Sequence, residues 1–129
     1  MLRFRTGIAL LVLCLGVPSL AAGQNPPPSL QAPTIAASIA SAADWATTYH
    51  ALSNYQVREM NPLLRSFDRT PGKMITMGAA IDAAGISAWN VTMGKKHPKV
   101  AAAGLWGMAA FRTYLAIHNI RNTRKAERR

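Results

Sequence analysis

The chain has 129 residues, of which 15 are Lys or Arg and 5 are Asp or Glu, so its formal net charge is +10 at neutral pH. Half of the residues are hydrophobic, and Cys14 is the only cysteine. This length suits a single domain, and one cysteine excludes disulfide bonds and cysteine-ligated metal sites within the chain.

The basic residues border the apolar segments of the chain. A surplus of cations is compatible with a nucleic-acid-binding protein, but here the cations stand in separate groups and form no continuous stripe. The groups are Arg3 and Arg5; Arg58, Arg65, Arg69 and Lys73; Lys95, Lys96 and Lys99; and Arg121, Arg124, Lys125, Arg128 and Arg129. Only Arg112 lies inside an apolar segment. This placement is typical of membrane spans, and we expect no nucleic-acid partner.

The N-terminal residues 1–23 have the three parts of a secretory signal peptide. A short basic region, MLRFR, is followed by an apolar run and by small residues that suit cleavage near Ala21 to Gly23. An uncleaved signal anchor is the alternative, and both cases place residue 24 outside the membrane. The next segment, 24–34, has four prolines in QNPPPSLQAPT and is predicted to be an extended tether with no helix.

Three further segments, 35–52, 74–93 and 100–120, have helical character. Each is close to the ~20 residues that a helix needs to cross ~30 Å of hydrocarbon. Pro71 and Pro98 precede the second and third segments, where the first helical turn tolerates proline. The sequence therefore predicts an all-α fold: a small transmembrane helical bundle with three helices after the signal segment, spanning 35–120 and followed by a basic tail, 121–129.

The charge on the loops predicts an orientation for this bundle. With the tether outside, the loop 53–73 and the C-terminal tail are cytoplasmic, and they hold nine basic residues against three in the outer loop 94–99. The positive-inside bias favours this multi-pass placement in a bacterial inner membrane. A soluble exported helical domain is the alternative, because Asp44 lies in the first segment and Asp is costly at the centre of a span.

The first segment has two different faces when it is drawn as a helix. Ser41, Asp44 and Thr48 share one stripe with Ala37 and Ala51, which we expect to face neighbouring helices. The bulkier residues Ile35, Ile39, Ala42, Trp45, Tyr49 and Leu52 form the neighbouring stripe, which we expect to face lipid.

Two carboxylates, Asp44 and Asp82, are predicted at similar depth near the middle of antiparallel spans. Asp82 shares its face with Gly78 and Gly85, which would let another backbone approach closely. Arg112 is within reach of one of these carboxylates by its long side chain. One interpretation is a structural network that fixes helix register; the other is paired carboxylates that handle a proton or a cation.

The stretch EMNPLL ends the loop that follows the first segment. Asn61 and Pro62 suit the start of a short helix on the cytoplasmic surface, and Glu59 precedes that start. Glu59 as a catalytic or metal-binding carboxylate is the alternative, although the sequence lacks the His and Glu spacing of a metal site.

These motifs resemble those of an uncharacterised family of small bacterial multi-helix membrane proteins with the signature D-x-x-[ST]-T followed by E-x-N-P-L. The matching residues are Asp44, Thr47, Thr48, Glu59, Asn61, Pro62 and Leu63. The resemblance covers roughly residues 35–120. It implies a multi-helix membrane protein and assigns no reaction.

Three functional hypotheses follow from the sequence. The first is an integral membrane protein with a structural or interaction role, whose partners are the lipid bilayer and a membrane protein or a second copy of itself. The second is a membrane-embedded enzyme or an ion-handling or proton-handling protein that uses Asp44, Glu59 and Asp82. The third is the exported soluble domain. The sequence contains no nucleophile elbow, phosphate loop, metal cluster or cofactor fingerprint, so we predict no cofactor and no metal.

Overall fold

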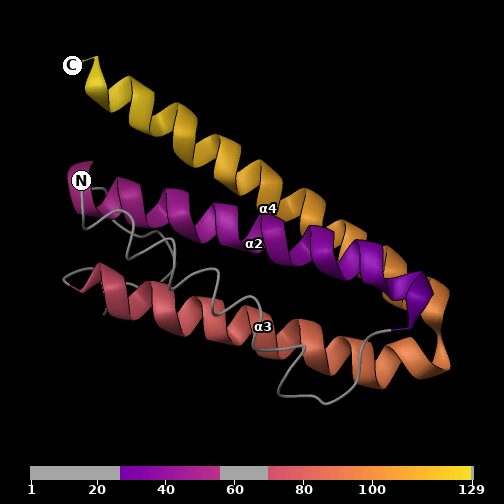
Figure 1. Cartoon of the computed structure of the whole chain (residues 1–129). Helices are drawn as coiled ribbons and strands as arrows, with labels where there is room; N and C mark the ends of the chain where they lie inside the picture. The colour runs from indigo at the N-terminus through magenta and orange to yellow at the C-terminus, as the bar shows by residue number, and fades with distance from the viewer. Residues whose placement is uncertain (1–26, 56–69, 129) are drawn as a thin grey trace.

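The computed structural model describes residues 27–55 and 70–128, which fold into three helices (Figure 1). These are α2 (Pro28–Tyr55), α3 (Pro71–Lys96) and α4 (Pro98–Glu127). The described residues contain no strand, so the prediction of an all-α fold with three helices is confirmed. The signal segment 1–23 and the turn with Glu59, Asn61 and Pro62 lie outside the described residues.

Helices α3 and α4 begin at the prolines that the sequence predicts. Pro71 and Pro98 lie in the first turn of their helices, where the missing N–H leaves no carbonyl unpaired. The backbone carbonyl of His97 accepts the N–H of Ala101 at 2.9 Å, while its own N–H donates to the carbonyl of Met93 at 2.7 Å. His97 is thus the single residue between α3 and α4, and it joins them as a tight helical hairpin.

The prediction of an extended tether over 24–34 is wrong from residue 28 onward, because α2 begins at Pro28. Pro28 starts the helix, and Pro33 lies one turn further in, where its ring removes a hydrogen bond to the carbonyl of Ser29 at a local cost of about 3 kcal/mol. Tertiary packing offsets this cost. Leu30 is fully buried, and its Cδ1 lies where a Cβ on Gly94 would stand.

The three helices form one bundle in which α2 and α4 run in the same direction and α3 runs opposite to both (Figure 1). Contacts at both ends support this arrangement. The start of α2 meets the α3–α4 hairpin through Leu30 and Gly94, and the end of α2 meets the end of α4 through Tyr55, whose hydroxyl donates to Glu127 Oε1 at 2.6 Å.

The core of the bundle is built mainly from small side chains. Along α4 the buried residues recur every four or seven positions, which places them on one face of the helix; they are Ala101, Leu105, Ala109, Ala116 and Thr123. Leu30, Ala37, Ala40 and Ile86 pack against this face. Small residues bring the helix backbones close together, as in helix packing within lipid.

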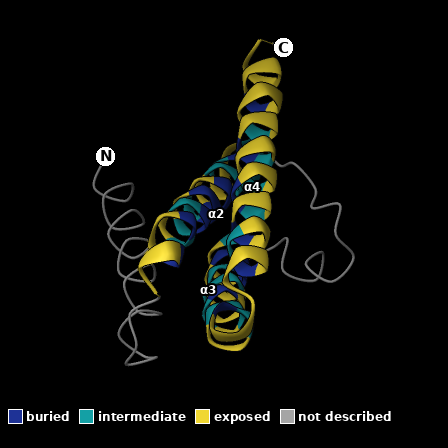
Figure 2. Cartoon of the chain, turned by 90° about the vertical axis from the view of Figure 1, so that its right-hand side faces the viewer, coloured by how far each residue is buried: buried dark blue, intermediate teal, exposed yellow. Residues whose placement is uncertain are grey.

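The outward sides of the helices are exposed (Figure 2), and their middle portions carry no fixed charge. On α2, the exposed residues between 32 and 49 are Ala32, Ile35, Ile39, Ala43, Ala46 and Tyr49. No exposed residue in 74–94 of α3 or 100–117 of α4 carries a fixed charge. Large apolar side chains lie on both helices, including Ile81 at 63% exposure and Phe111 at 59%.

Among the described helices, α4 alone is long and apolar enough, by length and composition, to cross a membrane. Only 22% of its most apolar window is buried inside the bundle. The helix also continues through the predicted basic tail as far as Glu127, so residues 121–127 extend the third segment as regular helix.

Candidate functional site

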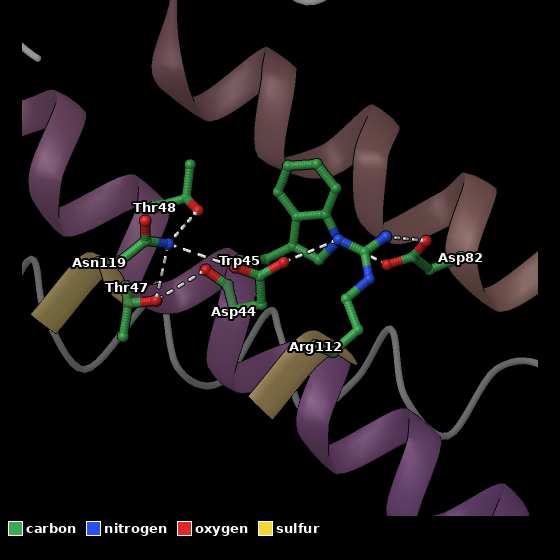
Figure 3. Close-up of polar contacts among 7 residues, drawn as sticks. All are labelled: Asp44, Trp45, Thr47, Thr48, Asp82, Arg112 and Asn119. Carbon is green, nitrogen blue, oxygen red and sulfur yellow. Dashed lines mark hydrogen bonds and ion pairs between the residues drawn. The ribbon is translucent and has the colours of Figure 1, made fainter. Parts of the chain in front are cut away.

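The site lies where Asp44 of α2, Asp82 of α3 and Arg112 of α4 meet inside the bundle (Figure 3). The hairpin explains the level of two of them. Asp82 and Arg112 are each 15 residues from His97, and residues equally distant from a tight turn between antiparallel helices lie at the same height because each residue rises 1.5 Å.

The guanidinium of Arg112 bridges the two carboxylates. Its Nη1 lies 2.7 Å from Asp44 Oδ2, and its Nη2 lies 2.5 Å from Asp82 Oδ1. The side chains are 19% exposed for Arg112, 6% for Asp44 and 11% for Asp82, so water screens these ion pairs little. Arginine suits this position because its planar fork offers separate N–H groups to two acceptors at once.

The second oxygen of each carboxylate also accepts a hydrogen bond. Trp45 Nε1 donates to Asp82 Oδ2 at 2.8 Å, and Asn119 Nδ2 donates to Asp44 Oδ1 at 3.2 Å. All four carboxylate oxygens therefore have a donor. In addition, the guanidinium carbon of Arg112 lies 5.4 Å from the centroid of the Trp45 ring, within the range of a cation–π interaction.

The two threonines of the sequence motif join this network through Asn119. The amide Nδ2 of Asn119 lies 2.9 Å from Thr48 Oγ1 and 3.3 Å from Thr47 Oγ1. Thr47 in turn donates its hydroxyl to the backbone carbonyl of Asp44 at 2.9 Å. The D-x-x-T-T spacing thus places one carboxylate and two hydroxyls around a single amide from α4.

Of the two glycines expected to flank Asp82, only Gly78 has a side chain of another helix packed against it. A Cβ on Gly78 would overlap the six-membered ring of Trp45, whereas a Cβ on Gly85 would meet nothing within 4 Å. Gly78 therefore provides the space in which the indole of Trp45 crosses from α2 to α3 and reaches Asp82.

The structure corrects the placement of Trp45. We expected its side chain to face lipid, but it is 7% exposed and packs with Met74 and Ile75 of α3. Trp45 lies at the border of the two stripes of α2, and its long side chain turns inward over Gly78 because Asp82 accepts its N–H. Ile35, at 58% exposure, does face outward as predicted.

Sequence reasoning also missed Asn119, although a signal was present. Asn119 lies seven residues after Arg112, which is two helical turns, so both point to the same side of α4. The structure brings together Asp44, Thr47, Thr48 and Arg112 from the predicted set, and joins Asp82 to them. Glu59, Asn61 and Pro62 lie outside the described residues.

Within residues 27–55 and 70–128, no group of three or more His, Cys, Asp or Glu side chains could hold a metal ion. The network instead consists of two anions, one cation and neutral donors that complete the hydrogen bonding of the anions. Its ion pairs join all three helices at one level.

The chain matches no model of a known protein family, no curated protein and no solved structure.

Proposed function

We propose that the chain is a small integral membrane protein with three spans, and that it acts as a structural or interaction component of the inner membrane. In this proposal α2, α3 and α4 cross the bilayer, and the ion pairs of Asp44 and Asp82 with Arg112 stabilise their packing.

The observation that carries the proposal is the distribution of charge between the inside and the outside of the bundle. Between Lys73 and Lys95 on α3, and between Lys99 and Arg121 on α4, no exposed side chain carries a fixed charge. The charged side chains inside these intervals, Asp82 and Arg112, point inward and pair. A water-soluble bundle of this size normally has the reverse pattern, with charges outside and apolar side chains inside.

The length of the uncharged surface also fits a bilayer. Each interval covers roughly 20 residues, or ~30 Å of helix, which matches the hydrocarbon thickness. The exposed hydroxyls of Thr76 and Thr92 within the α3 interval donate to carbonyls of their own helix, at 2.8 and 2.7 Å. Polar groups that face lipid need such internal partners.

Neither α2 nor α3 has a segment as apolar as that of α4, and this has a simple explanation in the proposal. Helix α2 is rich in Ala, and α3 is rich in Ala and Gly; several of these small residues are buried between the helices. A face that packs against protein does not need strongly apolar side chains. The outward faces alone meet lipid, and they carry residues such as Ile39 at 61% exposure and Ile81 at 63%.

The proposal also includes an orientation. The tether side and the hairpin at His97 lie outside, and the end of α4 lies in the cytoplasm, in line with the loop charges. Because α2 and α4 run in the same direction, the start of α2 and the hairpin are on one side of the bundle and the ends of α2 and α4 on the other.

Alkaline carbonate extraction of membranes tests the proposal. We expect the full chain to stay in the pellet after carbonate and after high salt, and to need detergent for release. Release by carbonate alone would refute the three spans and support the exported soluble domain. A peripheral protein of the same membranes, monitored in the same samples, shows that the extraction worked.

A second candidate function rests on the two carboxylates of the network. Asp44 and Asp82 share one guanidinium inside the proposed spans, and carboxylates within a membrane also form proton pathways. This arrangement favours a proton-handling role for Asp44 and Asp82.

Reconstitution into vesicles separates the two candidates. If the protein handles protons, wild-type vesicles collapse an imposed pH gradient and the Asp82→Asn variant does not, although the variant keeps its helical content. If the network has a structural role alone, vesicles with wild type or with the variant hold the gradient as long as empty vesicles do.

A further inference from the structure

The last turns of α4, together with its C-cap residue Arg128, carry a row of four cations on one side of the helix. Arg121, Arg124, Lys125 and Arg128 are spaced by three, four and seven residues from the first of them, so they share one helix face. All four are exposed. The row, here called the basic stripe, is ~10 Å long at 1.5 Å per residue.

The one acid in this part of α4 is kept away from the basic stripe. Glu127 lies on another side of the helix, and its Oε1 accepts the hydroxyl of Tyr55 from the end of α2. Thr123, opposite the stripe, is buried and donates to the carbonyl of Asn119 at 2.8 Å. These contacts hold the segment as a helix against α2 and leave the four cations facing outward, with no ion pair to any described residue.

The basic stripe continues the outward apolar face of the same helix. Tyr114, at 63% exposure, and Ile117, at 46%, lie seven and four residues before Arg121 on that face. The ring of His118 stacks on Tyr114 with 6.1 Å between centroids. Along this line the surface changes from apolar and aromatic to basic within about three turns, as the polarity of a bilayer changes from hydrocarbon to headgroup.

We propose that the basic stripe binds the headgroups of anionic phospholipids in the cytoplasmic leaflet. This inference rests on the proposed span of α4, which places Arg121 at the depth of the phosphates. Guanidinium groups bind phosphate oxygens through paired N–H bonds, and each basic residue near an anionic membrane surface contributes about fivefold in affinity. The rigid helix presents the four cations together, so they act on the same small group of headgroups.

A lipid headgroup fits this surface better than a nucleic acid or an acidic protein. The stripe is short, and its neighbours toward the bundle are apolar and aromatic residues that the proposed span places in lipid. A soluble polyanion would have to approach across the membrane surface to reach Arg121, whereas a lipid is already there.

Lipid binding to the purified full chain in neutral detergent tests this inference. The affinity for dispersed phosphatidylglycerol is compared with that for phosphatidylcholine, by native mass spectrometry of the protein–lipid adducts. The stripe variant carries Arg121→Gln, Arg124→Gln, Lys125→Gln and Arg128→Gln. Its matched control removes the same charge elsewhere, with Lys73→Gln, Lys95→Gln, Lys96→Gln and Lys99→Gln, all four exposed. Helical circular dichroism shows that both variants are folded.

We expect wild type to prefer phosphatidylglycerol, the stripe variant to lose at least about tenfold in that affinity, and the control to lose less than about twofold. Added salt lowers the wild-type preference because it screens charge. Equal losses in the stripe variant and the control would overturn the inference, as would displacement of the lipid by soluble glycerol phosphate, or tighter binding of single-stranded RNA or polyglutamate.

Carbonate extraction of the same variants keeps this test separate from that of the proposed function. If the stripe variant stays in the membrane pellet and binds phosphatidylglycerol as wild type does, the stripe inference fails while the three spans stand. If wild type itself leaves the membrane, the spans fail and the inference fails with them.

Discussion

Arg112 is the residue on which the interior of the bundle depends. It is the one cation among the described residues that pairs with both Asp44 and Asp82, and it lies beside the ring of Trp45. Removing one partner of a buried ion pair leaves the others charged and unpaired, which costs more than the pair contributed. The three helices should therefore be more sensitive to this position than to any exposed charge.

We expect Arg112→Ala to lower the free energy of unfolding by about 3–5 kcal/mol. Arg112→Lys keeps the charge but cannot reach both carboxylates with separate N–H groups, so we expect a loss of about 1.5–3 kcal/mol, the contribution of one charged hydrogen bond. Denaturant titration in neutral detergent, followed by helical circular dichroism, measures both. Lys96→Ala, an exposed control, should change stability by less than about 0.5 kcal/mol. Equal effects of all three substitutions would contradict the role of Arg112.

At this scale the sequence predicted part of the site. The carboxylates and Arg112 were identifiable because charged residues are rare in apolar segments and need partners. The role of Trp45 was not predictable, since the sequence does not show which way an indole at the border of two helix faces turns. The seven-residue spacing from Arg112 places Asn119 on the right side of α4, but its hydrogen bonds depend on where Asp44 and Thr48 lie. Equal spacing of Asp82 and Arg112 from His97 was a usable signal for their pairing.

At the scale of the helices, small residues decide how closely α2 and α3 approach. Gly78 lies under the ring of Trp45, while Gly85, two turns further along, faces open space. The two glycines look alike in the sequence, because both share the face of Asp82. Their difference arises from the inward turn of the Trp45 side chain, which belongs to tertiary structure.

This pair of glycines gives a matched test of the α2–α3 contact. We expect Gly78→Ala to destabilise by about 1–3 kcal/mol, since the added methyl overpacks against Trp45 and disturbs its bond to Asp82. Gly85→Ala should be neutral or stabilising by up to about 1 kcal/mol, because Ala favours helix and meets no neighbour. The same unfolding titration measures both. A stabilised Gly78→Ala variant would show that the indole does not occupy this space.

The contact between the ends of α2 and α4 predicts a pH dependence. The bond from the Tyr55 hydroxyl to the carboxylate of Glu127 raises the pKa of Tyr55 above its ordinary value of 10.0. A raised pKa means that the fold favours the neutral phenol, so the contact is fully present below pH 10.0 and is lost as the pH rises through the raised pKa. We expect Glu127→Gln to lower the pKa of Tyr55. Ultraviolet absorbance titration measures it, with Tyr55→Phe subtracted to remove the signals of Tyr49 and Tyr114. An unchanged pKa in Glu127→Gln would contradict the contact.

The helix boundaries were predictable where proline stands at a natural start, as at Pro71 and Pro98. The boundaries were not predictable where tertiary packing outweighs the local conformational preference of the sequence. Pro33 argues against helix when only its neighbours in the sequence are considered, yet α2 includes it because Leu30 and Ala37 on either side are fully buried. Only the position of the α3–α4 hairpin makes that burial possible.

On the scale of the whole molecule, the two ends of the described chain lie at opposite ends of the bundle. The start of α2 lies with the hairpin at His97, and the end of α4 lies at the other end, so the three proposed spans would place them on opposite sides of a membrane. The order of the helices along the chain predicted that α3 runs opposite to its two neighbours. The sequence alone could not predict every helix face that contacts a neighbour, because these contacts depend on how far each helix is shifted along the next.

Labelling of single cysteines tests the topology. In a chain with Cys14→Ser, we expect Lys96→Cys to react with a membrane-impermeant maleimide in intact spheroplasts, and Ala126→Cys to react only after permeabilisation. Both positions are exposed, so access to the reagent is limited by the membrane alone. Labelling of Ala126→Cys in intact spheroplasts would reverse or refute the orientation.

The tight turn at His97 has a consequence for how the bundle assembles. Asp82 and Arg112 lie at one level of the same hairpin, so α3 and α4 can form their ion pair without α2. In the proposed membrane placement, the hairpin would insert with these two charges already paired. Asp44 adds a second ion pair to Arg112 and joins α2 to the hairpin at the same level.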